Sequence, residues 1–288
     1  MKKLFLVTGM HRSGTSCVAN LLHRLGLDFG KDPGLSEAKL DNKYGNWEDR
    51  DFVSTNDSLL LYKHSFWFDP FNFRSPESLA EVPEYIQKKT AAIDRRVAGA
   101  ERNTGIKDPR SSLTLPFWRK ALSEPELNLV YVFRKPESVA ASLASRNSIP
   151  FEYGLALWEY YVRAAAVGAK DMKCTYVAFD RLISNPQITC RKLADEMELK
   201  VAPKNIRNAI DAVIDPKACT PDSSTPALPD EVDDLFDALE SRGLAFIASE
   251  ISEFALQSWQ QLAPNVHSRF MHKEVLFLRD RFLDAPPS

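Results

Sequence analysis

The segment LFLVTGMHRSGTS, residues 4–16, joins a short apolar run to a glycine loop and to the start of a helical pattern. The run 4–7 predicts a β-strand, and the residues after 16 predict a helix. In a strand–loop–helix unit, backbone N–H groups of the loop and of the helix N-terminus face an anion. Gly9 and Gly14 have the spacing of a nucleotide-phosphate loop, but Thr15 stands where that loop has its lysine. The segment therefore predicts a loop for an anion that carries less charge than a nucleoside triphosphate.

The run Arg12-Ser13-Gly14-Thr15-Ser16 resembles the 5′-phosphosulfate-binding loop of sulfotransferases that use 3′-phosphoadenosine-5′-phosphosulfate as the donor. The resemblance implies a loop that holds the donor without a metal ion, through one guanidinium, backbone amides and hydroxyl groups. The residues that it implies for this donor site are His11, Arg12, Ser13, Gly14, Thr15 and Ser16. The alternatives are a plain glycine turn and a degenerate nucleotide loop.

A second motif follows the apolar run LNLVYV, residues 127–132. Arg134 stands at the end of this expected strand, and Pro136 suits the first turn of a helix. Ser142 follows Arg134 by eight residues, an offset that resembles the arginine and serine with which sulfotransferases hold the 3′-phosphate of the donor. A guanidinium fork fits a phosphate group. The alternative is a surface arginine at a strand end and an ordinary helix serine.

The tripeptide Lys107-Asp108-Pro109 comes after a short expected strand and is similar to one in the protein-tyrosine and bacterial branches of the family. The resemblance places Lys107 near the oxygen that bridges phosphate and sulfate. The alternative is a loop lysine paired with Asp108. The resemblance covers residues 1–200. Two features of the cytosolic branch are missing from this chain: Pro109 stands in place of that branch's catalytic histidine, and the late Gly-x-x-Gly-x-x-Lys signature is absent.

Sulfuryl transfer needs a base, cations near the transferring group, and two substrates held in line. Arg12 and Lys107 can supply the positive charge. Glu48 follows a Gly-Asn-Trp turn, in a region from which several branches of the family take a glutamate, and it is the expected base. Asp49 and other acidic neighbours leave a solvated acidic loop as the alternative. His64 is the second candidate for the base.

Expected strands alternate with expected helices, which predicts an α/β fold in which helices cover both faces of a parallel sheet, the P-loop NTPase-like fold of sulfotransferases. The first strand is expected together with its loop over 3–13, and further strands are expected at 104–107, 127–133 and 174–179. Helices are expected at 14–25, 83–100, 114–122, 136–146, 152–170 and 186–197, with a polar stretch over 28–58. Ligand loops then gather at the carboxyl ends of the strands. The glycine loop, Lys107, Arg134 and Asp180 all stand at such ends.

Three regions are expected: an α/β domain over 1–214, a Pro-, Asp-, Ser- and Thr-rich loop or linker over 215–231, and a helical extension over 232–288. The extension is expected to pack on the same domain, and a homodimer contact is the alternative. The segment 65–74 has five aromatic residues within positions 66–73. It suits either an acceptor site or a plug of the hydrophobic core.

The chain has 288 residues, a net charge of −2 and four cysteines. The charge argues against non-specific nucleic-acid binding. The scattered cysteines and histidines favour reduced thiols and no metal site. Apolar runs are too short for a membrane span, and two lysines lead directly into the first strand instead of a signal peptide. A cytoplasmic enzyme is expected.

These observations predict transfer of a sulfuryl group from 3′-phosphoadenosine-5′-phosphosulfate to a hydroxyl of a carbohydrate or small glycoconjugate. A P-loop kinase and a catalytically inert nucleotide-binding module are the alternatives. Thr15 in place of the lysine disfavours the kinase.

Overall fold

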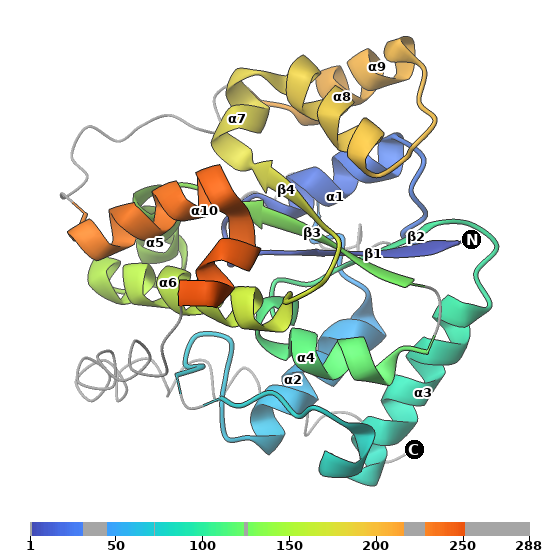
Figure 1. The fold of residues 1–288 in the computed structure, drawn as a ribbon, viewed down its shortest axis with the longest axis vertical. Coiled ribbons are helices and arrows are strands. Elements are labelled where there is room, and N and C mark those ends of the chain that lie inside the picture. The colour runs from blue at the N-terminus through green and yellow to red at the C-terminus, as the bar shows by residue number, and fades with distance from the viewer. Residues whose placement is uncertain (1, 31–44, 72, 124–125, 216–227, 251–288) are drawn as a thin grey trace.

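A four-stranded parallel sheet lies at the centre of the molecule, with the strand order β2-β1-β3-β4 (Figure 1). The strands are β1 (Lys3–Thr8), β2 (Thr104–Lys107), β3 (Glu126–Phe133) and β4 (Cys174–Ala178). Every neighbouring pair is parallel, so all four carboxyl ends lie at one edge of the sheet. This computed structural model describes residues 2–30, 45–71, 73–123, 126–215 and 228–250.

Helices cover both faces of the sheet (Figure 1). One face carries α1 (Thr15–Arg24), α7 (Phe179–Ser184), α8 (Pro186–Glu196) and α9 (Pro203–Val213). The other core contains α2 (Arg50–Tyr62), α3 (Glu84–Ala98), α4 (Ser111–Ala121), α5 (Pro136–Asn147), α6 (Phe151–Gly168) and α10 (Asp230–Glu250). A short 3₁₀ helix, η2 (Leu79–Glu81), precedes α3. The predicted fold class is confirmed.

Alternate residues of the central strands enter the two cores. Leu4 and Leu6 of β1 pack with α2 to α6, while Phe5 packs with α1 and the helices after β4. Tyr131 and Val132 of β3 divide between the two cores in the same way. Because successive side chains of a strand point to opposite faces, a central parallel strand buried on both faces reads as a continuous apolar run.

Three helices lie where the sequence predicts none. α2 lies within and beyond the expected polar stretch 28–58, and α7 and α9 follow β4 and α8. The helix α10 matches the start of the expected extension and packs against α6. Its backbone is non-helical at Gly243, and the N–H of the next residue, Leu244, donates to the Tyr176 hydroxyl at 3.1 Å. The expected helical stretch 270–283 lies outside the described residues.

Candidate active site

The loop after β1 approaches two other segments so closely that only glycine fits at two positions. A Cβ on Gly9 would lie 1.9 Å from the carbonyl oxygen of Val132 in β3, and one on Gly14 would lie 2.2 Å from the ring of Phe179. Both glycines have positive φ, 151° and 90°, and Arg12 between them has a φ of 71°. The helix α1 starts directly after Gly14, and no side chain caps its first amides. The loop and the start of α1 therefore present backbone N–H groups at the carboxyl edge of the sheet.

Gly9→Ala is expected to lower the free energy of unfolding by about 3 kcal/mol, because the new methyl group overlaps the Val132 carbonyl in addition to straining the backbone. Gly26 is the matched control. It also has positive φ, 101°, but a Cβ there meets nothing within 4 Å, so Gly26→Ala should cost only the strain, about 1 kcal/mol. Urea unfolding of both variants measures the difference. Equal losses would show that the approach of Gly9 to β3 is not tight.

Ser13 shows that the loop fits an anionic ligand. Its side chain is fully buried, and its Oγ has no hydrogen-bond partner within the described residues. A buried hydroxyl without a partner costs about 1–3 kcal/mol, which a bound anion would recover. The two glycines let this loop, the donor cradle (residues 9–16), lie close to β3 and α7, because a Cβ at either position would overlap the Val132 carbonyl or the Phe179 ring. Backbone amides, a buried hydroxyl and the adjacent Arg12 together suit a phosphate or phosphosulfate group.

The end of β2 brings Lys107 to the expected base, Glu48. Lys107 is 3% exposed, and its Nζ donates to Glu48 Oε1 at 2.7 Å and to the Asn46 carbonyl at 3.0 Å. Ser16 Oγ of the glycine loop donates to the same carbonyl at 3.2 Å. Among the described residues, Lys107 pairs with Glu48 and Asp108 pairs with Arg110, so the alternative ion pair between Lys107 and Asp108 does not form. Three segments that are distant in the sequence thus connect the ammonium, the carboxylate and the loop.

Arg12 and Ser142 also meet. Arg12 Nε donates to Ser142 Oγ of α5 at 2.9 Å. The sequence assigned these residues to opposite ends of the donor, the 5′-phosphosulfate and the 3′-phosphate. Their contact shows that the loop after β1 and the first turns of α5 form one continuous surface.

Arg134 lies at the carboxyl end of β3, as the strand pattern predicts. Its guanidinium packs over the Phe179 ring, 5.4 Å from the centroid, and its Nε lies 4.0 Å from Asp180 Oδ1. The same Phe179 ring contacts Gly14 of the loop, so Arg134 borders the donor loop across one aromatic side chain. Asp180 also accepts a hydrogen bond from the backbone N–H of Lys135 at 3.0 Å. These contacts hold the guanidinium at the edge of the sheet.

A buried polar network, which the sequence did not reveal, holds the turn that follows Lys107. Arg110 forms ion pairs with Asp57 of α2 at 2.6 Å and with Asp108 at 3.0 Å. Asn56, also of α2, donates to Asp108 Oδ2 at 2.8 Å. Burial raises the pKa of the Asp108 carboxyl, and the Arg110 charge opposes that shift. The network fixes the turn after β2 against α2, and so fixes the direction from which Lys107 enters the site.

The ring of His11 turns toward the aromatic segment. Its centroid lies 4.5 Å from that of Trp67 and 6.0 Å from that of Tyr161 in α6. His11 Nε2 is buried and has no hydrogen-bond partner among the described residues. Burial lowers the pKa of His11 well below 6.5, and neighbouring cations add to this effect. In decreasing order of effect these cations are Arg110, Lys107, Arg12 and Arg146. The imidazole is therefore neutral at pH 7.

Most of the aromatic segment is a core plug. Phe68, Phe71 and Phe73 are buried, and tyrosines of α6 hold the backbone around them. The hydroxyls of Tyr153, Tyr160 and Tyr161 donate to the carbonyls of Phe68, Phe73 and Trp67 at 2.9, 3.2 and 2.8 Å. Trp67, which is half-buried, is the member of the segment that contacts the candidate site.

His64 lies apart from Glu48. Glu48 precedes the N-terminus of α2 and His64 follows its C-terminus, so a helix of 13 residues, about 20 Å long, lies between them. His64 is exposed, and within the described ranges its ring shares no hydrogen bond or ring contact with another candidate residue. The structure brings Glu48, Lys107, Arg12, Ser16 and Ser142 together and leaves His64 outside this group.

The family model for the sulfotransferase family matches residues 5–203 of the chain. The chain is a member of the sulfotransferase family. The crystal structure of sulfotransferase STF9 from Mycobacterium avium has the same fold, with a TM-score of 0.54 at 13% identity, over 83% of this chain and 76% of that one. The sulfotransferase domain of the Synechococcus PCC 7002 olefin synthase is also similar, with a TM-score of 0.47 at 15% identity, over 83% and 94% of the two chains. No curated protein matches the sequence.

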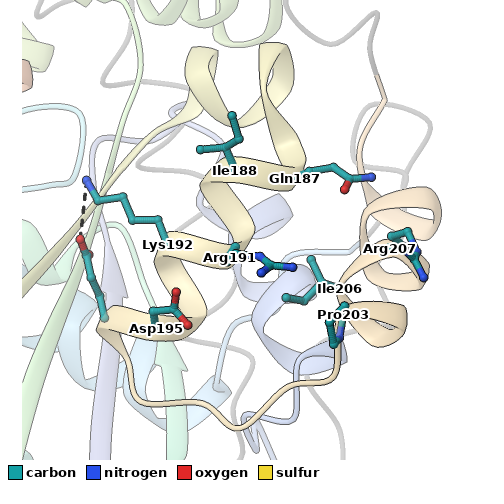
Figure 2. Close-up of a pocket in the computed structure, with 9 residues that line it drawn as sticks. Gln187, Ile188, Arg191, Lys192, Asp195, Pro203, Ile206 and Arg207 are labelled. Atoms are coloured by element: carbon teal, nitrogen blue, oxygen red, sulfur yellow. Dashed lines mark ion pairs between the residues drawn. The ribbon is translucent and has the colours of Figure 1, made fainter.

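A surface groove of this sulfotransferase lies away from the candidate site. It measures about 540 Å³ and lies between α8 and α9, and Figure 2 shows the side chains that line it. Arg191 and Arg207 extend along it, and Lys192 pairs with Glu196 at 3.6 Å (Figure 2). None of the candidate residues lines this groove. The groove is therefore a surface feature of the two helices rather than part of the active site.

Three further observations concern the described residues alone. They contain no group of three or more His, Cys, Asp and Glu side chains placed to hold a metal ion. Among their helices, none combines the length and the apolar character that a membrane crossing requires. Cys17, Cys174 and Cys190 form no disulfide, and Cys219 lies outside the described ranges.

Proposed function

We propose that this sulfotransferase moves a sulfuryl group from 3′-phosphoadenosine-5′-phosphosulfate to a hydroxyl group. The observation that carries the proposal is the lysine-free glycine loop, in which the buried Ser13 hydroxyl has no partner in the described part of the chain and Arg12 contacts Ser142. A donor of this class supplies an activated sulfuryl group and needs no metal ion for neutralisation. The residues present fit its two anionic ends, with the glycine loop at one end and Arg134 at the other.

Each residue has a distinct proposed role in this reaction. The glycine loop, from His11 to Ser16, binds the 5′-phosphosulfate through amides and hydroxyls, and Arg12 adds positive charge beside the transferring group. Arg134 and Ser142 bind the 3′-phosphate. Lys107 stabilises charge on the leaving oxygen. Glu48, the base predicted from the sequence, accepts a hydrogen bond from Lys107. We propose that Glu48 positions the Lys107 ammonium group.

The acceptor that we propose is a hydroxyl of a carbohydrate or small glycoconjugate in the cytoplasm. Trp67 supports this class, because a half-buried indole beside the site offers a flat face on which a sugar ring packs. A library of monosaccharides, glycosides and phenols, incubated with donor carrying ³⁵S in the sulfuryl group, identifies the acceptor. Transfer to phenols alone would contradict a carbohydrate acceptor.

Adenosine 3′,5′-bisphosphate should bind the protein at least about 30-fold more tightly than AMP or ATP, without Mg²⁺. The reason is that only this ligand engages both the loop and the 3′-phosphate residues, and one charged hydrogen-bonded contact contributes about 2 kcal/mol or more. Isothermal titration calorimetry of the three nucleotides, with and without Mg²⁺, tests the expectation. Tight ATP binding that requires Mg²⁺ would favour the kinase. Tight bisphosphate binding with neither transfer nor donor hydrolysis would favour the inert module.

A further inference from the structure

We propose that His11, rather than Glu48, accepts the proton of the acceptor hydroxyl, and that the acceptor binds against the His11 and Trp67 side chains. The inference deepens the proposed function and rests on it. It also changes the role that the sequence suggests for His11, from the donor loop to the acceptor side of the site.

The first argument is the direction of the His11 ring. Arg12, the next residue of the loop, extends to Ser142. Ser13 Oγ is buried and has no partner among the described residues. The His11 ring instead packs on Trp67, with 4.5 Å between centroids and 41° between planes. One residue of the loop thus reaches from the donor cradle to the aromatic segment, which places a proton acceptor between the two substrates.

The second argument is the empty hydrogen-bonding capacity of the ring. No described residue forms a hydrogen bond with the buried His11 Nε2, and a buried unpaired nitrogen costs about 1–3 kcal/mol. The nearest aromatic hydroxyl does not relieve it, because Tyr161 donates to the Trp67 carbonyl at 2.8 Å. Trp67 is half-buried and packs against the ring, so we place the incoming hydroxyl beside this indole.

The third argument is protonation. The groups that face His11 are Arg12 from its own loop, Lys107 from the end of β2, Arg110 from the turn before α4, Arg146 from α5 and Tyr161 from α6. Four of these are cations, and with burial they hold the pKa of the imidazole below its ordinary value. The ring is therefore neutral at pH 7 and has a lone pair for a proton, although the same cations make it a weaker base than an ordinary imidazole. Glu48 Oε1, by contrast, already accepts a hydrogen bond from the Lys107 ammonium at 2.7 Å.

The chemistry balances with these residues. The acceptor oxygen forms a bond to sulfur as the bond from sulfur to the bridging phosphate oxygen breaks. The bridging oxygen keeps the electron pair of the broken bond, beside the Lys107 ammonium. The proton of the acceptor hydroxyl moves to His11, and solvent takes it up before the next turnover.

The test compares His11→Gln with Glu48→Gln and with His23→Gln. His23 is the matched control, because it also packs on a tryptophan, Trp47, at 5.0 Å, but it lies on the exposed side of α1. We expect His11→Gln to lower kcat by about 10²–10⁴-fold with the acceptor found in the ³⁵S screen. The affinity for adenosine 3′,5′-bisphosphate should stay within about 3-fold of the wild type, a factor smaller than one hydrogen bond contributes. Glu48→Gln should lose less turnover, and His23→Gln none.

Two readouts separate this role from a structural one. In ¹³C-histidine NMR, the resonance that His11→Gln removes should titrate below pH 6.5 in the wild type without donor. In the pH–rate profile, the acidic limb should be absent from His11→Gln and present in Glu48→Gln. A tenfold or larger loss of bisphosphate affinity in His11→Gln would return the residue to the donor site and overturn the proposal. Unchanged kcat in His11→Gln would overturn it while the sulfotransferase function stands. A wild-type protein that neither binds the bisphosphate nor transfers sulfuryl would remove both.

Discussion

Lys107→Met should lower kcat by about 10²–10³-fold, the scale measured when one positioned donor to a developing negative charge is removed. Methionine keeps the length and apolar stem of the side chain, and Lys107 is only 3% exposed, so the change removes mainly the charge. Adenosine 3′,5′-bisphosphate keeps the former bridging oxygen as an oxygen of its 5′-phosphate but has no transferring sulfuryl group, so its affinity should fall by less than about 10-fold, within 1.4 kcal/mol.

The control for this prediction is Lys89→Met. Lys89 also donates to two oxygens, those of Ser54 and Ser58 at 2.9 and 3.3 Å, but it joins α3 to α2 outside the site. Steady-state kinetics of both variants, with circular dichroism as a check of folding, measures the difference. If Lys107→Met loses bisphosphate affinity and keeps kcat, the ammonium binds the donor in the ground state and does not stabilise the leaving oxygen.

Strands and the donor loop could be predicted from the sequence because their signals are local. The runs that form β1 and β3 are apolar at successive positions, as expected for central parallel strands. The two glycines of the loop report a backbone that only glycine adopts, and the structure gives the reason in Val132 and Phe179. Local patterns of this kind do not depend on which distant segment packs on them.

The helix α2 was missed because the middle of its buried face is polar. Apolar residues are buried near both ends of the helix, Phe52 and Leu59 among them, but Asn56 and Asp57 between them are buried too and in the sequence look like a solvated loop. Their partners are Asp108, Arg110 and, for the Asn56 amide oxygen, Trp118 at 2.8 Å, and all of these lie about 50 or more positions later. Buried hydrogen-bonding groups of this kind interrupt the apolar stripe by which an amphipathic helix is recognised.

The same limit applies to the site. A lysine followed by an aspartate suggests a local ion pair, but Lys107 pairs with Glu48 and Asp108 pairs with Arg110. Successive residues at a strand end point in opposite directions, so the two charges of a dipeptide enter different environments. The position of Arg134 at the end of β3 followed from the strand pattern, whereas the contact between Arg12 and Ser142 depends on how α5 docks against the loop.

Arg134→Ala should weaken the binding of adenosine 3′,5′-bisphosphate by about 2–4 kcal/mol, which is roughly 30- to 1000-fold in Kd. The side chain is 15% exposed and is held between Phe179 and Asp180, so little entropy is lost when it binds a phosphate. AMP lacks the 3′-phosphate, and its affinity should change by less than about 3-fold, under 0.7 kcal/mol. The ratio of the two affinities therefore reports the 3′-phosphate contact alone.

Arg181→Ala is the matched control for this loss of charge. Arg181 adjoins Asp180 in α7 but is 66% exposed and pairs with Glu240 of α10 at 2.8 Å. Calorimetry of both ligands on both variants gives four comparisons, and only the bisphosphate on Arg134→Ala should show a large loss. Equal losses for AMP and the bisphosphate would mean that Arg134 acts on the shared part of the nucleotide. The donor's 3′-phosphate would then need another partner at this edge of the sheet, and Ser142 with Arg12 is the pair that the structure places there.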